Sequence, residues 1–357
     1  MKQNKIFLTG GHGATTALAT AEKLQSYDLS LYWIGSRYAQ EGKKALAFEF
    51  VTFPKYGIKC LPIRAGRIQR KLTRHSLSSF FKIPFGFWDS LRHILKYRPD
   101  LVLSFGGFAA FPVCFWGWVF NIPVIIHEQT TAAGLANRAT ALFASKVALA
   151  RQSSAEFFDN SKIVVLGNPV RSVVLNVTPP KKLPKLPVVY ITGGSRGSSW
   201  INKALRPILP EILKNYKVVH QAGPLDYKKF YALKNKNYEV YKFLDEEQLR
   251  KVYQKAHIII GRAGANTVAE ILCLQIPSIL IPIPWVQKDE QTENAKLVQK
   301  AGFGEILSQD DLSPTTLKNK LQVVRDNWIK MKNRALEHKS NDTEAADKLA
   351  KLVLETI

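Results

Sequence analysis

Short apolar runs that are followed by a small-residue turn and an amphipathic helix recur along the chain. In the clearest case, residues 258–260 are three isoleucines that predict a buried parallel strand, residues 261–266 predict a tight turn, and a helix is expected from Thr267 onward. Such a turn leaves backbone N–H groups uncovered at the positive end of a helix, where a diphosphate can approach closely. Glu270 has two interpretations: it binds a ligand, or it completes a capping box with Thr267.

The same pattern opens the chain. Residues 5–9 predict a strand, Gly10-Gly11-His12-Gly13 predicts a turn, and residues 15–24 predict a helix. The turn is not GxGxxG, and the next strand ends in Gly35-Ser36-Arg37 without an acidic residue, which argues against a nicotinamide dinucleotide. His12 follows a strand at the mouth of a parallel sheet, which is a catalytic position in such folds, but it could also only close the turn.

A proline-rich stretch divides the chain in two. Residues 173–187 hold too many prolines for a continued helix or a central strand, so they are interpreted as a linker. The pattern then restarts with a Gly-rich turn at residues 192–198, a helix that we expect to be broken near Pro207 and Pro210, and a final strand at residues 278–283.

We therefore expect an α/β fold with two doubly wound, Rossmann-like domains that face one another across a cleft. The expected parts are an N-terminal domain (1–172), the linker (173–187), a C-terminal domain (188–335) and a C-terminal helix (336–357). One arrangement considered for this helix packs it back on the N-terminal domain.

Residues 101–126 carry no charge and are long enough to span a bilayer. Pro112, Asn121 and Pro123 interrupt the segment, and Gly106-Gly107 follows a strand-like start. We therefore favour a strand, a turn, a short buried helix (108–120) and a second strand over a transmembrane helix.

The charge and the cysteine content indicate which partners and which cellular compartment to expect. The chain has 51 Lys and Arg against 28 Asp and Glu, a formal net charge of +23, so its partner should be polyanionic. Helix-turn-helix, zinc and RNA-binding signatures are missing, and we therefore expect no nucleic acid. Three widely spaced cysteines without CxxC favour a reducing compartment, and no export signal is visible at the amino terminus.

The segment from Arg64 to Arg98 is basic and aromatic at once, which suits contact with anionic lipid. The alternative is a helix over residues 85–97 that buries Trp88, Leu91 and Leu95 and leaves the arginines in solvent. The residues concerned are Arg64, Arg67, Arg70, Lys71, Arg74, Lys82, Arg92, Lys96 and Arg98 with Phe80, Phe81, Phe85, Phe87 and Trp88.

Six motifs, in order and spread over nearly the whole chain, together resemble the MurG family of lipid I N-acetylglucosaminyltransferases. Each motif alone is weak, but six collinear ones are strong. They are Thr9-Gly-Gly-His12, His127-Glu-Gln129, Gly167-Asn-Pro-Val-Arg171, Gly193-Gly-Ser195, Gly261-Arg-Ala-Gly-Ala-Asn-Thr-Val-Ala-Glu270 and Asp289-Glu-Gln-Thr-Glu-Asn-Ala295.

The resemblance implies a GT-B fold and an inverting transfer of N-acetylglucosamine from UDP-N-acetylglucosamine to lipid I, the undecaprenyl-diphosphate-linked muramoyl pentapeptide, in peptidoglycan synthesis. It implies that Glu270 holds the ribose and that Leu244 presents its backbone to uracil. It further implies that Arg171, Ser195 and the turn Ala265, Asn266, Thr267 and Val268 contact the diphosphate, that Gln291 and Asn294 bind the sugar, and that Thr9, Gly10, Gly11, Phe108, Glu128 and Thr130 line the acceptor side.

The implied chemistry agrees with the residues. Helix N-termini and Arg171 supply positive potential where the leaving UDP gathers charge, and a neutral His12 is a suitable base for the acceptor hydroxyl. No carboxylate pair of metal-binding type is evident, so we expect catalysis without a metal or another cofactor. We expect the protein at the cytoplasmic face of the cell membrane, as a peripheral protein.

The chain also departs from the family pattern. Thr130 stands where relatives have an asparagine, Phe108 where they have a tyrosine, and Glu290 where they have a histidine, so acceptor and sugar contacts are open at these positions. A different lipid acceptor, such as diacylglycerol, and a UDP-sugar epimerase activity remain alternatives on the same fold.

Overall fold

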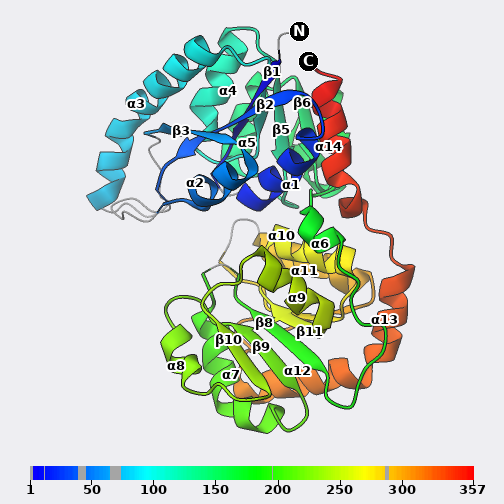
Figure 1. Cartoon of the computed structure of the whole chain (residues 1–357). Helices are drawn as coiled ribbons and strands as arrows, with labels where there is room; N and C mark the ends of the chain where they lie inside the picture. Colours follow the sequence, from blue (N-terminus) through cyan, green and yellow to red (C-terminus); the bar gives the residue numbers. More distant parts are fainter. Residues whose placement is uncertain (1–2, 12, 39–45, 65–73, 195, 286–288) are drawn as a thin grey trace. The chain divides into compact units, whose positions relative to one another are not determined.

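The computed structural model describes residues 3–11, 13–38, 46–64, 74–194, 196–285 and 289–357, with the side chains of residues 74–82 outside that description. The chain forms two compact units (Figure 1), which are Met1–Arg171 with Asn341–Ile357, and Ser172–Ser340. The proline-rich segment 173–187 thus belongs to the second unit, and residues 341–357 return to the first.

The first unit is a parallel sheet with helices on both faces, and its seven described strands have the order β3-β2-β1-β4-β5-β6-β7. Its strands are β1 (Asn4–Thr9), β2 (Leu29–Ser36), β3 (Lys59–Ile63), β4 (Leu101–Ser104), β5 (Val124–Glu128), β6 (Lys146–Leu149) and β7 (Ile163–Val165). Its helices are α1 (Ala14–Leu24), α2 (Phe48–Thr52), α3 (Arg74–Tyr97), α4 (Ala110–Val119), α5 (Leu135–Thr140) and α14 (Ala345–Leu354).

Alternation along β1 builds the core of this unit. Ile6 and Leu8 are buried with the apolar sides of α1 and α14, whereas Phe7 between them joins a second cluster with residues of α3 and α4. Successive side chains of a strand point to opposite faces, so a strand that is apolar throughout must be covered on both sides. Helix α14 packs against α1 in this way, which ties the C-terminal segment into the first unit (Figure 1).

The second unit repeats the architecture, and its six described strands have the order β10-β9-β8-β11-β12-β13. Its strands are β8 (Val188–Thr192), β9 (Lys217–Gln221), β10 (Tyr238–Tyr241), β11 (Ala256–Gly261), β12 (Ser278–Leu280) and β13 (Gly304–Ile306). Its helices are α6 (Ser172–Leu175), α7 (Ser199–Ile212), α8 (Tyr227–Tyr231), α9 (Glu246–Lys255), α10 (Ala265–Leu274), α11 (Glu290–Lys300), α12 (Pro314–Asp326) and α13 (Trp328–Glu337).

The expectation of two doubly wound α/β domains is confirmed. In both sheets the strand order reverses beside the first strand, at β1 and β4 in one unit and at β8 and β11 in the other. Ligands of open parallel sheets bind outside the carboxyl ends of the strands at such a reversal. The glycine turns after β1 and β8 are therefore at the positions where this fold holds a ligand.

Expectations about three elements need correction. Helix α7 runs unbroken through Pro207 and Pro210, because both prolines lie on its exposed face, where water can satisfy the carbonyl groups that lose their partners. The strand expected at residues 278–283 ends at Leu280 and is not the last, since β13 follows it. Helix α3 begins at Arg74 rather than near Phe85.

The uncharged segment 101–126 forms β4, α4 and the start of β5, as favoured from the sequence. Among the described residues, every helix is too short or too polar to cross a membrane.

Candidate functional site

The Gly-rich turn after β8 is compact because two of its residues have no room for a side chain. A Cβ atom at Gly193 would lie 2.2 Å from the backbone nitrogen of Ser198. Gly197 has φ of 73°, and its Cβ would lie 2.3 Å from the carbonyl oxygen of Ala222. The turn delivers Ser198 as the N-cap of α7, where its hydroxyl accepts from Ile201. Ser195, expected at the diphosphate, lies outside the described residues.

The turn after β11 presents a second helix N-terminus. Helix α10 begins at Ala265, two residues earlier than expected, and its N-cap Gly264 offers no side chain. The first N–H groups of a helix have no intrahelical partner, and here the first turn holds no acidic residue that would neutralise them. A Cβ at Gly264 would meet nothing within 4 Å, so the space beside Gly264 is open within this unit.

Four residues expected at the diphosphate therefore belong to the first turn of α10. Ala265, Asn266 and Thr267 are partly exposed, whereas the side chain of Val268 is buried. Only backbone groups of Val268 can face a ligand here, and its N–H already donates to the carbonyl of Gly264 at 3.0 Å. The first three residues are thus better placed for an anion than the fourth.

A buried arginine, which the sequence analysis did not single out, joins the two turns. The guanidinium group of Arg262 donates to Ser198 Oγ at 2.9 and 3.1 Å, to the carbonyl of Ile281 at 3.0 Å and to Gln309 Oε1 at 2.7 Å. These partners are all neutral oxygens. Burial lowers the pKa of Arg262 to about 10, which still leaves it positive at neutral pH. The two helix N-termini thus lie beside a buried positive charge.

Glu270 is not the capping residue that one interpretation proposed. The N-cap of α10 is Gly264, which puts Thr267 and Glu270 inside the helix. Instead, Glu270 Oε2 accepts a hydrogen bond of 2.7 Å from the hydroxyl of Tyr253, a buried residue of α9. The carboxylate is therefore held in one orientation by a neighbouring helix.

Leu244 lies between β10 and α9. It is buried, and its backbone N–H donates to Gln221 Oε1 at 3.1 Å. The next residue, Asp245, caps α9 with Gln248 in a full capping box, which fixes the chain direction directly after Leu244.

Gln291 and Asn294 bind the loops around them. The amide of Asn294, which is buried, donates to the carbonyl of Ala263 at 3.2 Å. Gln291 accepts from the backbone N–H of Ile283 at 3.1 Å. Helix α11 thus supports both the turn after β11 and the chain after β12.

In the first unit, the turn after β1 packs on the turn after β4. The N–H of Gly11 donates to the carbonyl of Gly106 at 2.8 Å, and a Cβ at Gly107 would lie 3.0 Å from Gly11. Gly10 is tight as well, because its Cβ would lie 3.2 Å from the Trp33 ring. The Thr9 hydroxyl is buried and donates to Ile34. His12, the expected base, lies outside the described residues.

Glu128 orders the loop that follows β5. Its buried carboxylate accepts from the backbone and hydroxyl of Thr130 at 3.0 and 2.7 Å, from the N–H of Gly134 at 3.2 Å and from the amide of Asn137 at 2.8 Å. Thr130 thus uses its hydroxyl within the loop. Phe108, at the start of the neighbouring segment, is 42% exposed.

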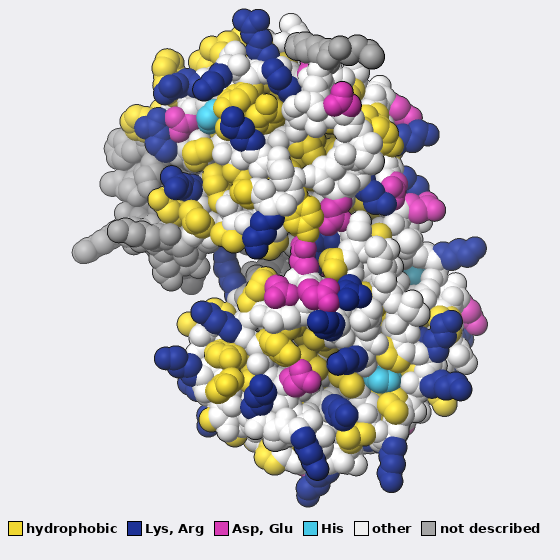
Figure 2. All heavy atoms as spheres, viewed as in Figure 1, with side chains coloured by type: hydrophobic (Ala, Val, Ile, Leu, Met, Phe, Trp, Pro, Cys, Tyr) yellow, Lys and Arg dark blue, Asp and Glu magenta, His cyan; other side chains and the backbone are white. Residues whose placement is uncertain are grey.

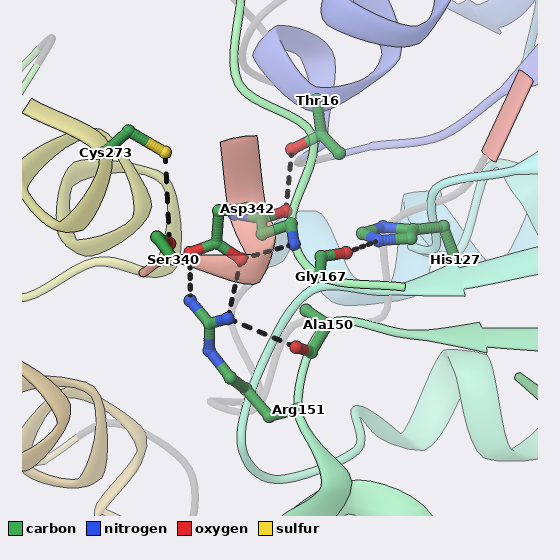
Figure 3. Close-up of polar contacts among 9 residues, drawn as sticks. Thr16, His127, Ala150, Arg151, Gly167, Cys273, Ser340 and Asp342 are labelled. Atoms are coloured by element: carbon green, nitrogen blue, oxygen red, sulfur yellow. Dashed lines mark hydrogen bonds and ion pairs between the residues drawn. The ribbon is translucent and has the colours of Figure 1, made fainter. Parts of the chain in front are cut away.

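The turn that carries Arg171 is held by the C-terminal segment (Figure 3). Asp342 is fully buried, and its carboxylate accepts from both terminal nitrogens of Arg151 at 2.6 Å and from the backbone N–H of Asn168 at 2.7 Å. On the other side of the turn, the carbonyl of Gly167 lies 3.0 Å from His127 Nε2. Burial lowers the pKa of His127 to about 4, so the ring is neutral and Nε2 donates.

Helix α3 exposes apolar side chains on one face, which contradicts the alternative in which Trp88 and Leu95 are buried. Phe85, Trp88 and Leu95 are all at least half exposed and follow helical spacing. Helix α4 packs against α3, and exposed Trp118 and Phe120 lie at its C-terminal end, Phe120 as the C-cap. Of the basic and aromatic residues expected here, Arg92, Lys96 and Arg98 are exposed, whereas Arg67, Arg70, Lys71 and the side chains of Arg74, Phe80, Phe81 and Lys82 lie outside the described residues.

On the face shown in Figure 2, dark blue Lys and Arg side chains are spread over both units, in line with the 51 Lys and Arg against 28 Asp and Glu of the chain. Across the described residues, no group of three His, Cys, Asp or Glu side chains could hold a metal ion.

Comparison with known proteins identifies the family. Residues 9–149 match the N-terminal domain of glycosyltransferase family 28, and residues 188–353 match its C-terminal domain. A Thermoanaerobacter sp. (strain X514) protein named UDP-N-acetylglucosamine--N-acetylmuramyl-(pentapeptide) pyrophosphoryl-undecaprenol N-acetylglucosamine transferase is 32% identical over 97% of this chain and 96% of its own. A Bacillus cereus (strain ATCC 14579) transferase 2 of the same name is 32% identical over 92% of this chain and 93% of its own. The crystal structure of Acinetobacter baumannii MurG superposes with a TM-score of 0.72 at 26% identity, covering 99% of both chains.

The chain belongs to the MurG family. Its two parallel sheets are those of the GT-B fold, as the resemblance implied. A Neisseria meningitidis UDP-GlcNAc 2-epimerase structure bound to UDP-GlcNAc also superposes, with a TM-score of 0.66 at 14% identity and coverage of 99% of this chain, which shows only a shared fold.

Within this MurG-family chain, the structure brings the turns after β8 and β11 together through Arg262, and it places Glu270 on the helix that one of them begins. Arg262 and Gln221 were missed because each looks like an ordinary strand-end residue in the sequence. The charge of Arg262 inside an otherwise small-residue turn was the available signal.

Proposed function

We propose that the chain transfers N-acetylglucosamine from UDP-N-acetylglucosamine to undecaprenyl-diphosphate-linked muramoyl pentapeptide, lipid I. The observation that carries the donor side is the convergence of the N-termini of α7 and α10 around the buried cation of Arg262. A diphosphate is the part of a nucleotide sugar that such a site recognises. The acceptor comes from the names of relatives that align over nearly the full chain.

In the proposed reaction, an acceptor hydroxyl oxygen attacks the anomeric carbon while the bond from that carbon to the β-phosphate oxygen breaks. The electron pair goes to UDP, where the helix N-termini and Arg171 stabilise the growing charge. His12 takes the proton of the hydroxyl. Glu270, oriented by Tyr253, accepts hydrogen bonds from the ribose hydroxyls.

Glu270→Gln tests the donor assignment without changing the size of the side chain. Replacing a charged acceptor should weaken UDP binding by roughly 10- to 100-fold in calorimetry, because hydrogen bonds to charged groups contribute about 1.5–3 kcal/mol. Glu247→Gln on the exposed face of α9 is the matched control and should leave binding unchanged. Equal affinity in the two variants would place the nucleotide elsewhere.

Labelled UDP-N-acetylglucosamine separates the acceptor alternatives. Offered lipid I and diacylglycerol in parallel, the enzyme should label only lipid I, and His12→Ala should abolish that labelling while UDP binding persists. Labelled diacylglycerol, or conversion of the donor to its epimer without an acceptor, would overturn the proposed reaction.

We further propose that α3 and the end of α4 contact an anionic membrane surface at the cytoplasmic face of the cell membrane. Exposed aromatic side chains beside Arg92, Lys96 and Arg98 support this, because apolar rings enter the acyl boundary while cations meet lipid phosphates. Sedimentation with anionic liposomes at low salt should weaken in Trp88→Ser with Trp118→Ser. Trp285→Ser, which removes an exposed ring of the second unit, should sediment like the unaltered protein. Equal binding by all three proteins would exclude this surface.

A further inference from the structure

Gln221 bridges two segments whose relative position matters for the proposed donor site. It is the last residue of β9, paired with Thr192 of β8 on one side and Tyr241 of β10 on the other, and it is buried. Its Nε2 donates to the carbonyl of Gly194 at 2.8 Å, and its Oε1 accepts from the N–H of Leu244 at 3.1 Å. One carboxamide therefore connects the Gly-rich turn to the segment before α9.

The two partners require an amide at this position. The carbonyl of Gly194 can only accept, and the N–H of Leu244 can only donate, so the orientation of the carboxamide is fixed by its surroundings. A glutamate would keep the acceptor and lose the donor, whereas a leucine of similar size would lose both. Gly194 has φ of 76°, its N–H donates to Thr192 Oγ1 at 3.0 Å, and its carbonyl also accepts from the N–H of Gly197 at 3.0 Å. These two bonds close the turn on itself, whereas the bond from Gln221 links the turn to the segment before α9.

We propose that Gln221 is a positioning residue that couples the diphosphate turn to the base-recognition segment of the donor site. The inference rests on the proposed function, in which the turn after β8 meets the diphosphate and Leu244 meets uracil. A ligand that contacts both segments binds more weakly when they are not already aligned, because the two segments must then be ordered during binding. Discrimination between bases depends on where the backbone of Leu244 stands.

Two variants separate the two hydrogen bonds. Gln221→Leu should raise the KM for UDP-N-acetylglucosamine about tenfold with kcat changed less than twofold, and should reduce the preference for UDP over CDP as inhibitors by a similar factor. Gln221→Glu keeps the bond to Leu244, so it should raise KM while the preference for UDP over CDP is largely kept. The control is Gln275→Leu, which removes a hydrogen bond to His338 at the C-terminal end of α10 and should lower the melting temperature without changing that preference.

If KM and the UDP preference of both folded Gln221 variants match those of Gln275→Leu, Gln221 is only structural and the proposal is wrong. If Gln221→Leu does not fold, a KM for Gln221→Glu that equals that of the unaltered enzyme overturns the proposal on its own. Failure of the unaltered protein to bind UDP would instead refute the proposed function, so the two failures are distinguishable.

Discussion

Removal of the Asp342 carboxylate should destabilise the first unit by about 4 kcal/mol. This carboxylate is fully buried and accepts hydrogen bonds from both terminal nitrogens of Arg151 and from the backbone N–H of Asn168. Asp342→Ala leaves the Arg151 charge without its counter-ion and the buried N–H of Asn168 without its acceptor, while Arg151 keeps a hydrogen bond to the carbonyl of Ala150 at 3.2 Å. Removing one partner of a buried ion pair typically costs about 3–5 kcal/mol, and an unsatisfied buried N–H costs about 1–3 kcal/mol. The two costs are not simply added here, because the same carboxylate makes both contacts.

Chemical denaturation followed by tryptophan fluorescence measures this loss, with the transition of each unit fitted separately. The control is Asp347→Ala, which removes the same charge from the same C-terminal segment. Asp347 pairs with Lys23 at 2.9 Å, but its side chain is 57% exposed, so its removal should cost under about 1 kcal/mol.

A double-mutant cycle separates the ion pair from the backbone contact. Arg151→Met in the Asp342→Ala background should recover part of the lost stability, since no buried charge is then left unpaired. If Asp342→Ala costs no more than Asp347→Ala, the C-terminal segment does not hold the turn that carries Arg171.

Three further outcomes follow from the second unit. Burial lowers the pKa of His220 to about 3, so this side chain stays neutral in the folded protein. Because the unfolded chain takes up a proton near pH 6.5, the free energy of unfolding should fall below that pH, by about 2 kcal/mol at pH 5. Denaturation measured across this pH range should show a flatter dependence for His220→Gln. Gly264→Ala should change the melting temperature by no more than a few degrees and yet weaken UDP binding. Gly197→Ala should lower both the melting temperature and the affinity for UDP, because its Cβ collides with the backbone. Arg262→Met should cost about 3 kcal/mol, because it leaves several buried oxygens without donors; a stability loss below 1 kcal/mol would show that water replaces it.

Periodicity predicted the strands and turns that carry the site because burial on both faces of a parallel sheet demands uninterrupted apolar runs. The three isoleucines before Gly261 could hardly form anything else, and β11 lies there. Short strands gave no such signal. Strand β13 is three residues long and is formed by pairing with β12, a contact that no local pattern contains.

Long-range contacts were equally out of reach. Asp342 lies in a polar stretch typical of a loop, and its partner Arg151 is 191 positions away. Trp88 and Leu95 follow the spacing of a buried helix face, yet they are exposed, because the same spacing serves a core and an interface. Helical spacing predicts which residues share a face, but whether that face is buried or exposed depends on the rest of the fold.

The two units share a topology but differ in the buried charged side chain that lies near the reversal of each sheet, and this difference bears on which unit receives UDP. At the reversal of the second sheet, the buried ion is the cation of Arg262, bonded to neutral oxygens. In the first sheet, the strand next to the reversal, β5, ends in the buried carboxylate of Glu128, which accepts from donors of its own loop. Bringing a diphosphate toward a buried carboxylate costs Coulomb energy that the same approach to a buried guanidinium would gain. The polarity of these two residues therefore favours the nucleotide in the second unit, independently of the helix N-termini that both units provide.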